Sequence, residues 1–195
     1  MLFERFTGEN AALLLIDHQI GTMGWVKSIS VEEMQRNVLM LAQTASTLNI
    51  PVVLTSNMED QGLGTLLSEL EPILPEAFAA RIKRVGAINA MEDKTFVAAV
   101  KDTGRKKLIL AGVTNDVSTV YPALTLVSEG YDVQVVADAG GSTSNMADDM
   151  ALRRMEHAGV VLTSTNQVIA ELAGDWSTPE GSQIIQQVIM PAMLG

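Results

Sequence analysis

The sequence predicts an α/β fold, a six-stranded parallel sheet between two layers of helices. Short apolar runs typical of buried strands alternate six times with amphipathic segments of helical spacing, and no internal repeat or linker interrupts them. The chain has 195 residues, 47% of them hydrophobic and 18% charged, which suits a substantial core and argues against disorder. We therefore expect a single domain over residues 1–195, built as a three-layer α/β/α sandwich with right-handed crossovers.

The first half of the chain supplies three of the strands. AALLLID predicts a buried strand at residues 11–17, and apolar residues then recur at helical spacing from Val31 to Leu48, with Ser30 as the candidate N-cap. PVVLTS predicts the second strand, because a strand tolerates proline at its first position. After an expected loop in NMEDQGLG and a short helix in LGTLLSELEPIL, residues 81–83 predict a short third strand.

The second half repeats the strand and helix pattern three times. KTFVAAVKDTG predicts a helix that Gly104 can end, and KKLILAG the fourth strand. In the next predicted helix, STVYPALTLVSEG, Pro122 has to lie in the first turn or bend the helix. YDVQVVADA predicts the fifth strand, NMADDMALRRMEHAG a helix closed by Gly159, VVLTST the sixth strand and NQVIAELAG the helix after it.

The tail at residues 178–195 follows the last strand and helix unit and is apolar. We interpret it as a packing or oligomerisation segment, a helix that lies on the body of the domain or on a neighbouring subunit. Its methionine-rich end favours the neighbouring subunit, because exposed methionines are typical of interaction surfaces.

Composition excludes several classes of function. The net charge of −10 argues against a nucleic-acid partner and against binding to anionic membranes. The apolar runs are too short to cross a bilayer, and MLFERFTGEN does not resemble a signal peptide, so we expect a cytoplasmic protein. The absence of cysteine excludes disulfides, thiolate metal sites and a cysteine nucleophile, and two histidines are too few for a histidine-rich metal site.

The fold class turns the ends of the strands into a list of candidate site residues. Ligands of open parallel sheets bind beyond the carboxyl ends of the strands, where the strand order reverses. In the commonest order the first and fourth strands are neighbours there, so Asp17 would face the turn before Ser118. The full list is Asp17, His18, Thr55, Ser56, Asn57, Arg84, Asn89, Gly112 to Ser118, and Asp138.

The turn in AGVTNDVSTVYPAL has features that suit covalent catalysis. Gly112 allows a close approach of backbone, and a helix that begins near Ser118 offers unpaired amides and a positive dipole end for an oxyanion. The alternative is that Asp116 or Ser118 only caps this helix, since aspartate and serine are common capping residues. The turn alone leaves both interpretations open.

Other motifs give weaker indications. The sequence has no G-x-S-x-G elbow and no P-loop. His18 follows Asp17 along a strand and is expected to point to the opposite face, and His157 lies near a helix C-terminus, where a cation is favoured without any catalytic role. Asp138 is expected to bind backbone amides at the end of a strand.

Three segments resemble the isochorismatase-like hydrolases, a superfamily of cysteine hydrolases. LLLIDHQIG resembles the opening signature, RVGAINAMED the middle motif of the YcaC-type branch, and LAGVTNDVSTVYPALTLVSEGYDVQVVADA the third motif, over residues 10–176. The resemblance implies an α/β/α sandwich and a catalytic trio of aspartate, basic residue and cysteine. These positions fall on Asp17, on Arg84 with Lys83 as the second candidate, and on Ser118.

The same resemblance implies further properties of the site. It predicts a non-proline cis peptide between Val113 and Thr114, which turns backbone amides, here those of Thr114 and Ser118, towards the substrate oxygen. Asn57, Asn89 and Asn115 become candidate residues of the cleft. The resemblance also implies a small-molecule substrate, no cofactor or metal, and a homo-oligomer, either a tetramer or an octamer.

Ser118 departs from the family pattern. In the family mechanism the aspartate takes a thiol proton and the thiolate attacks an amide or imide carbonyl, whereas a serine hydroxyl needs a stronger base than a carboxylate. The serine could be an engineered replacement, a natural residue of an enzyme that lost or modified the chemistry, or a sign of water activation without a covalent step. We expect a hydrolase of small amide or imide C–N bonds, either fully active or impaired by the serine; the alternative is an inactive small-molecule binder or scaffold.

Overall fold

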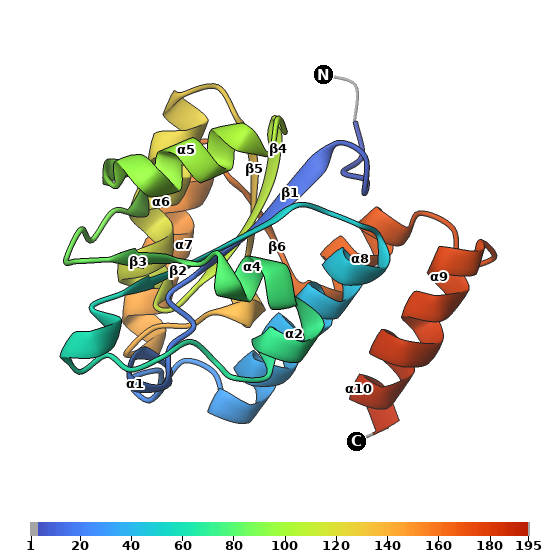
Figure 1. The fold of residues 1–195 in the computed structure, drawn as a ribbon, viewed down its shortest axis with the longest axis horizontal. Helices are drawn as coiled ribbons and strands as arrows, with labels where there is room; N and C mark the ends of the chain where they lie inside the picture. Colours follow the sequence, from blue (N-terminus) through green and yellow to red (C-terminus); the bar gives the residue numbers. More distant parts are fainter. Residues whose placement is uncertain (1–3, 195) are drawn as a thin grey trace.

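In a computed structural model of the chain, which describes residues 4–194, six parallel strands form one sheet in the order β3-β2-β1-β4-β5-β6 (Figure 1). The expected parallel α/β sheet is therefore confirmed, and β1 and β4 are neighbours at the point where the strand order reverses. The strands are β1 Ala11–Ile16, β2 Val52–Asn57, β3 Ile82–Arg84, β4 Lys107–Gly112, β5 Asp132–Val136 and β6 Val161–Thr163.

Helices cover both faces of the sheet, with α5, α6 and α7 on one side and α2 and α8 on the other (Figure 1). Ser30 caps α2 through its side chain, as the sequence predicts. The helices are α1 Ile20–Met23, α2 Val31–Thr47, α3 Leu70–Ile73, α4 Pro75–Ala79, α5 Lys94–Asp102, α6 Val120–Ser128, α7 Asn145–His157, α8 Thr165–Ala173, α9 Pro179–Ile184 and α10 Met190–Leu194.

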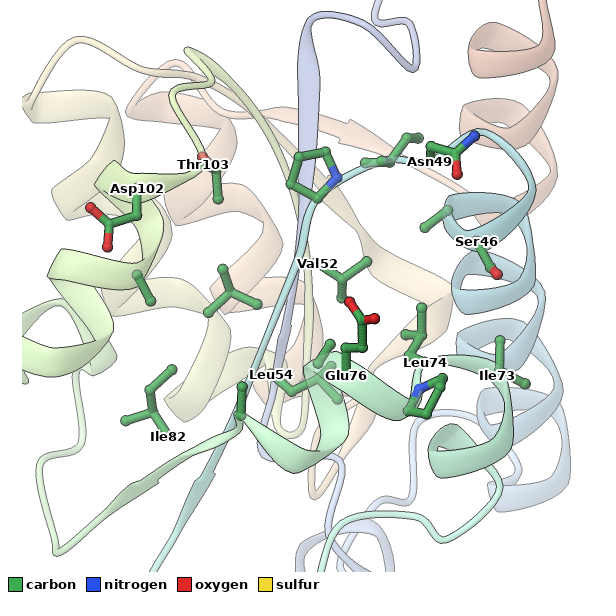
Figure 2. A pocket seen from close by; sticks show the side chains of 18 residues that line it. Ser46, Asn49, Val52, Leu54, Ile73, Leu74, Glu76, Ile82, Asp102 and Thr103 are labelled. Atoms are coloured by element: carbon green, nitrogen blue, oxygen red, sulfur yellow. The ribbon is translucent and has the colours of Figure 1, made fainter.

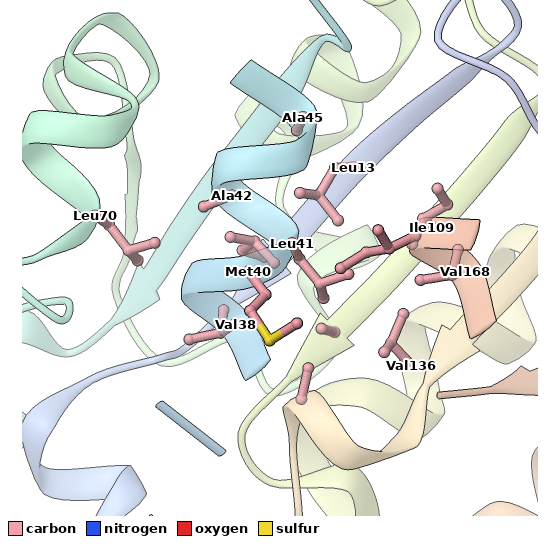
Figure 3. Packing of buried hydrophobic residues seen from close by; sticks show 14 of the residues in the cluster. Leu13, Val38, Met40, Leu41, Ala42, Ala45, Leu70, Ile109, Val136 and Val168 are labelled. Atoms are coloured by element: carbon pink, nitrogen blue, oxygen red, sulfur yellow. The ribbon is translucent and has the colours of Figure 1, made fainter. Parts of the chain in front are cut away.

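Two hydrophobic cores lie on opposite faces of the sheet because side chains alternate along each buried strand. Leu13 and Leu15 of β1 enter the core beneath α2, whereas Leu14 and Ile16 enter the core beneath α5 and α6. Figure 3 shows the first core, in which Leu41 of α2 lies over the sheet beside Ile109 of β4. This packing on both faces fixes β1 and β4 and thereby the position of their carboxyl ends.

The sequence placed several boundaries wrongly. The segment after β4 begins with a π-helical turn, Asn115–Thr119, so helical structure precedes Ser118. Pro122 lies in the first turn of α6, which was one of the two expected positions. The short helices α1 and α4 were not predicted, because each is held by tertiary contacts and not by a periodic apolar pattern. Pro51 precedes β2 instead of opening it.

The C-terminal segment forms α9, a π-helical turn at Ile185–Ile189 and α10, and lies outside α2 and α8 at the edge of the molecule (Figure 1). Ile184 and Val188 are buried in the core, while Met190, Met193 and Leu194 are exposed. The segment therefore packs on the body of the same chain and also presents apolar side chains outward. Among residues 4–194, no helix has the length and apolar character needed to cross a membrane.

Candidate active site

Asp17 follows β1 and leaves the geometry of the strand. Its φ of 59° lies in the left-handed region, which aspartate tolerates better than most residues. Its amide donates to the Thr55 carbonyl oxygen at 2.9 Å, and its carbonyl oxygen accepts from the Thr22 hydroxyl at 2.7 Å. These bonds hold the buried Asp17 carboxylate at the edge of the sheet. Because the backbone of Asp17 is left-handed, the direction of its side chain does not follow the alternation of side chains along β1.

Arg84, the last residue of β3, forms an ion pair with Asp17 across β2. Its Nη2 donates to Asp17 Oδ1, its Nη1 donates to the Ala87 carbonyl oxygen, and its Nε donates to Thr55 Oγ1 at 3.0 Å. Both partners of the ion pair are buried. Every nitrogen of the guanidinium therefore has a protein acceptor. The bonds to Thr55 and Ala87 hold the guanidinium in place, and its Nη2 holds the Asp17 carboxylate.

Lys83 contacts a different carboxylate. Its Nζ lies 3.2 Å from Glu59 Oε1, and Arg81 Nη2 lies 2.8 Å from the same oxygen. Hydrogen bonds from Arg81, followed by those from Ser56 and Lys83, hold the pKa of Glu59 down at about 2 in spite of its burial. Of the two candidate basic residues, the structure therefore brings Arg84 and not Lys83 to Asp17.

Ser118 completes a chain of three side chains that lie far apart in the sequence. Its Oγ donates to Asp17 Oδ2 at 2.9 Å, on the carboxylate oxygen that Arg84 does not use. The hydroxyl is buried within the π-helical turn after β4. A π-helical turn is often found at functional sites, where it shifts one side chain out of the regular helical position.

The turn before Ser118 is closely packed. The peptide bond between Val113 and Thr114 is cis. A Cβ at Gly112 would lie 2.6 Å from Thr119 Oγ1 and 3.1 Å from the Ile16 carbonyl oxygen, so a larger residue would push the turn away from β1. The absence of a side chain at Gly112 lets the end of β4 approach Asp17.

The amides of Thr114 and Ser118 were both expected to point towards a substrate oxygen, and the structure differs for Ser118. The Ser118 amide donates to the Thr114 carbonyl oxygen at 2.8 Å, and the Thr119 amide donates to the same oxygen at 3.1 Å. The Ser118 amide is therefore engaged within the turn, because the tight π-helical geometry directs it backward. Within residues 4–194 the Thr114 amide has no hydrogen-bond acceptor, so of this pair it is the one whose N–H is not engaged in the turn.

Burial sets the protonation of the central carboxyl. The pKa of Asp17 is raised above its usual value of 3.8 by loss of solvent, although the charge and hydrogen bond of Arg84 and the hydrogen bond of Ser118 act in the opposite direction. A carboxylate with a raised pKa is a better proton acceptor than an exposed aspartate. The raised pKa therefore makes Asp17 a stronger base towards the Ser118 hydroxyl, from which it accepts a hydrogen bond.

Comparison with known proteins gives the family of this arrangement. The family model of the isochorismatase domain, which describes sequences of that family, matches residues 11–167, from the first residue of β1 into α8. The chain belongs to the isochorismatase family. Within this family it falls in the YcaC branch, since it is 39% identical over 174 residues to the probable hydrolase YcaC of Escherichia coli, covering 89% of this chain and 83% of that protein.

Solved YcaC structures share the whole fold. The structure of YcaC from Pseudomonas aeruginosa, described with hexane-2,5-diol and covalent acrylamide, is 38% identical and has a TM-score of 0.92 over 100% of this chain and 96% of that one. The Escherichia coli YcaC structure, described as an octameric hydrolase of unknown specificity, is 37% identical, also with a TM-score of 0.92, over 100% and 95%. The six-stranded sheet and its helical layers are therefore those of isochorismatase-family hydrolases.

The three asparagines that were predicted to line the cleft form hydrogen bonds with other residues of the chain. Asn57 accepts from the Gly86 amide and donates to the Ala87 carbonyl oxygen, which fastens the loop after Arg84. Asn89 caps the following turn and donates to Thr125 of α6. Asn115 is fully buried and donates to Ala137 and Asp148, so the expectation that it lines the cleft is wrong.

Sequence reasoning missed the support around the trio. Gln19 exchanges two hydrogen bonds with the backbone of Asn57, at 2.8 and 3.0 Å, and donates to the Gly64 carbonyl oxygen at 2.6 Å. Thr55 was named only as a strand-end residue, yet it orients Arg84. The sequence feature that could have identified Gln19 as a supporting residue was its polar side chain, two residues beyond Asp17. Asp138, by contrast, accepts from the Thr165 amide at 2.7 Å, as predicted for a turn residue.

His18 lies beside Asp17 in the chain but contacts another part of the site. It is fully buried, and its Nε2 lies 2.8 Å from the Ala139 carbonyl oxygen. It has no hydrogen bond to Ser118, in agreement with the expectation, although the left-handed backbone at Asp17 and not strand alternation sets its direction. Burial lowers the pKa of His18 from 6.5 to about 4.

This lowered pKa predicts a loss of stability in mild acid. Because the folded protein binds the His18 proton more weakly than the unfolded chain, the stabilisation is complete above about pH 6.5 and is lost as the pH falls towards 4. We expect the free energy of unfolding to fall by about 2 kcal/mol more between pH 7 and pH 5 in the native chain than in a His18→Gln variant. Urea unfolding at a series of pH values measures this difference.

The matched control is His157→Gln, at the exposed histidine in the last turn of α7. This variant should keep the pH dependence of the native chain. If His18→Gln and His157→Gln followed the same curve as the native protein, the buried neutral state of His18 would be contradicted.

A large pocket lies away from the trio. A cavity of about 710 Å³ opens beside the first half of β2, which β3 does not reach, between α2, α4 and the end of α5. Figure 2 shows Val52, Leu54, Glu76 and Asp102 around it. Its lining includes none of Asp17, Arg84 and Ser118. Among residues 4–194 no group of three or more histidine, cysteine, aspartate or glutamate side chains is placed to hold a metal ion.

Proposed function

We propose that the protein hydrolyses a C–N bond of a small amide or imide through Asp17, Arg84 and Ser118. The observation that carries this proposal is the hydrogen bond of 2.9 Å from Ser118 Oγ to Asp17 Oδ2, on a carboxylate whose other oxygen is held by Arg84. A nucleophile in contact with a base, which a third group orients, is the arrangement that covalent catalysis requires.

The proposed reaction has two stages. Asp17 takes the Ser118 proton while Oγ attacks the carbonyl carbon, and the Thr114 amide donates to the oxygen that becomes negative. The C–N bond then breaks, Asp17 returns the proton to the nitrogen, and an ester remains on Ser118. From an amide, ammonia or an amine leaves; from a cyclic imide, the nitrogen stays as a primary amide at the other end of the acyl group. Water, deprotonated by Asp17, attacks this ester; the acid leaves and Ser118 recovers its proton.

The relatives support hydrolysis, a nucleophile and an oligomer. One YcaC is described as a hydrolase, and another carries covalent acrylamide, a bond that requires a nucleophilic atom in that protein. We propose that Ser118 stands where the family has its cysteine, and that this chain forms a homo-oligomer, as the octameric relative does. The exposed Met190, Met193 and Leu194 of the C-terminal segment are available for such contacts.

A second candidate function is binding without turnover. It is favoured by the chemistry of the hydroxyl, because serine is far less acidic than cysteine. Among residues 4–194, the basic group that Ser118 contacts is the Asp17 carboxylate. On this alternative the same site would hold a small molecule and leave its amide bond intact.

Replacement of Ser118 by cysteine tests the proposal. With propanamide, nicotinamide and succinimide as substrates, we expect Ser118→Cys to raise kcat/KM for one or more of them at least about tenfold, because a thiol ionises more readily beside Asp17. Ammonia release reports turnover of the two amides, ring opening reports turnover of succinimide, and intact-protein mass reports an acyl adduct on residue 118.

Ser118→Ala is the control and should give neither turnover nor adduct. Activity retained in Ser118→Ala would show that serine is not the nucleophile. Tight binding of these compounds, with no turnover by the native chain or by Ser118→Cys, would favour the second candidate function.

A further inference from the structure

The edge of the sheet around the trio is acidic. The five segments that follow β1 to β5, at residues 17–30, 58–66, 85–93, 113–122 and 137–149, contain nine aspartates and glutamates and one cation, Lys27. Since the carboxyl ends of parallel strands meet at one edge, these segments gather there. Asp17 and Glu59 are paired with cations, and the other seven carboxylates leave the edge with a negative charge. A substrate with a negative charge would be repelled from this edge.

The cation of the trio is not available to a substrate. Arg84 is buried, and its Nε, Nη1 and Nη2 donate to Thr55, Ala87 and Asp17. The two other cations of the same strand region, Arg81 and Lys83, both pair with Glu59. Recognition of a carboxylate or phosphate group needs unpaired donors of this kind.

Four exposed side chains that lie near the trio in the sequence are apolar. Ile20 lies three residues beyond Asp17, Val85 and Ile88 follow Arg84, and Val117 precedes Ser118. These four side chains are 43–81% exposed, although each belongs to a residue type that is usually buried. Exposed apolar groups gathered around a polar centre are typical of a site for an apolar ligand.

From these three observations we infer that the site takes an uncharged carboxamide with an apolar acyl group, held by Ile20, Val85, Ile88 and Val117, and that it rejects acyl groups with a carboxylate. This inference rests on the proposed amide hydrolysis. The polar trio would contact only the reacting amide, and the apolar side chains would cover the remainder of the substrate.

Two amides of similar length test the inference. Pentanamide ends in a methyl group and succinamate ends in a carboxylate. We expect kcat/KM, measured by ammonia release with the native chain and with Ser118→Cys, to be at least about 100-fold higher for pentanamide. Equal rates, or a preference for succinamate, would overturn the inference and leave amide hydrolysis intact. If neither protein hydrolysed either compound, the proposed function would fail and the inference with it.

A single added cation should change this preference. Val85→Lys places an ammonium next to Arg84 at a position that is 81% exposed, so the fold has room for it. We expect the ratio of kcat/KM for pentanamide to that for succinamate to fall at least about tenfold. The matched control is Val161→Lys, at an exposed valine on the edge strand β6, which should leave the ratio unchanged.

Two results with Val85→Lys would contradict contact between Val85 and the substrate. An unchanged ratio in Val85→Lys would show that this side chain does not face the substrate. Loss of the oligomer in Val85→Lys but not in Val161→Lys, measured by size-exclusion chromatography, with the ratio unchanged, would place Val85 in a subunit contact and overturn the inference.

Discussion

An Asp17→Asn variant is expected to hydrolyse amides about 100-fold to 10,000-fold more slowly than its parent. Asparagine keeps the size of the side chain and can still accept a hydrogen bond from Ser118, but it cannot take the proton from the hydroxyl. The effect should fall on kcat, because the lost interaction is with the reacting proton and not with the bound substrate. Single-turnover ammonia release, with Ser118→Cys as the parent, separates this step from substrate binding.

The control for Asp17→Asn is Asp138→Asn. Asp138 also follows a strand of the sheet, but its carboxylate accepts from the amide and hydroxyl of Thr165, at the start of α8. Hydrolysis by this variant should stay within about twofold of the parent, since the substitution changes a capping contact. Equal losses in the two variants would mean that Asp17 acts through stability and is not the base.

An Arg84→Met variant is expected to lose about 3–5 kcal/mol of unfolding free energy at neutral pH. Methionine fills much of the same volume, but Asp17 would keep a buried charge without its partner, and Thr55 and Ala87 would lose the donors that satisfy them. The pKa of Asp17, already raised by burial, should rise further without the opposing charge. Because the carboxyl can then protonate, the loss of stability should become smaller as the pH falls.

Arg81→Met provides the comparison for Arg84→Met. Arg81 also pairs with a buried glutamate, but Glu59 keeps Lys83 as a second cation and Ser56 as a donor. We expect a loss of about 1 kcal/mol, because the remaining charge is still compensated. Urea unfolding of the two variants measures the difference, and equal losses would contradict the assignment of Arg84 as the sole cation of Asp17.

The sequence predicts the parallel sheet and its two layers of helices correctly. Alternating apolar runs and amphipathic segments predict the six strands, because each parallel strand is buried on both faces and each crossover must cover one face. It failed at short elements such as α1, α4 and the π-helical turn. These contain fewer than six residues each, and their stability comes from contacts with distant segments.

The candidate site was only partly predictable. Strand ends and the family resemblance identify Asp17, Arg84 and Ser118, but nothing local distinguishes Arg84 from Lys83, which are adjacent on one strand. Side chains alternate along β3, so one of the two had to face Asp17, and the pairing of β3 with β2 decided which. The asparagines show the opposite case, since an amide side chain suits a ligand and a loop equally well and only its partners distinguish the two roles.

The amino-acid sequence by itself determined the parallel sheet, the edge where a ligand would bind and the residue types at that edge, because periodicity and turn chemistry are local properties. The tertiary structure decided that Asp17 contacts both Arg84 and Ser118, that the Ser118 amide turns back to Thr114, and that Arg84 is buried in its ion pair with Asp17. These contacts join residues 67 and 101 positions apart, and they depend on strand order, on register and on the left-handed backbone of Asp17. None of these is encoded in the residues of any one segment.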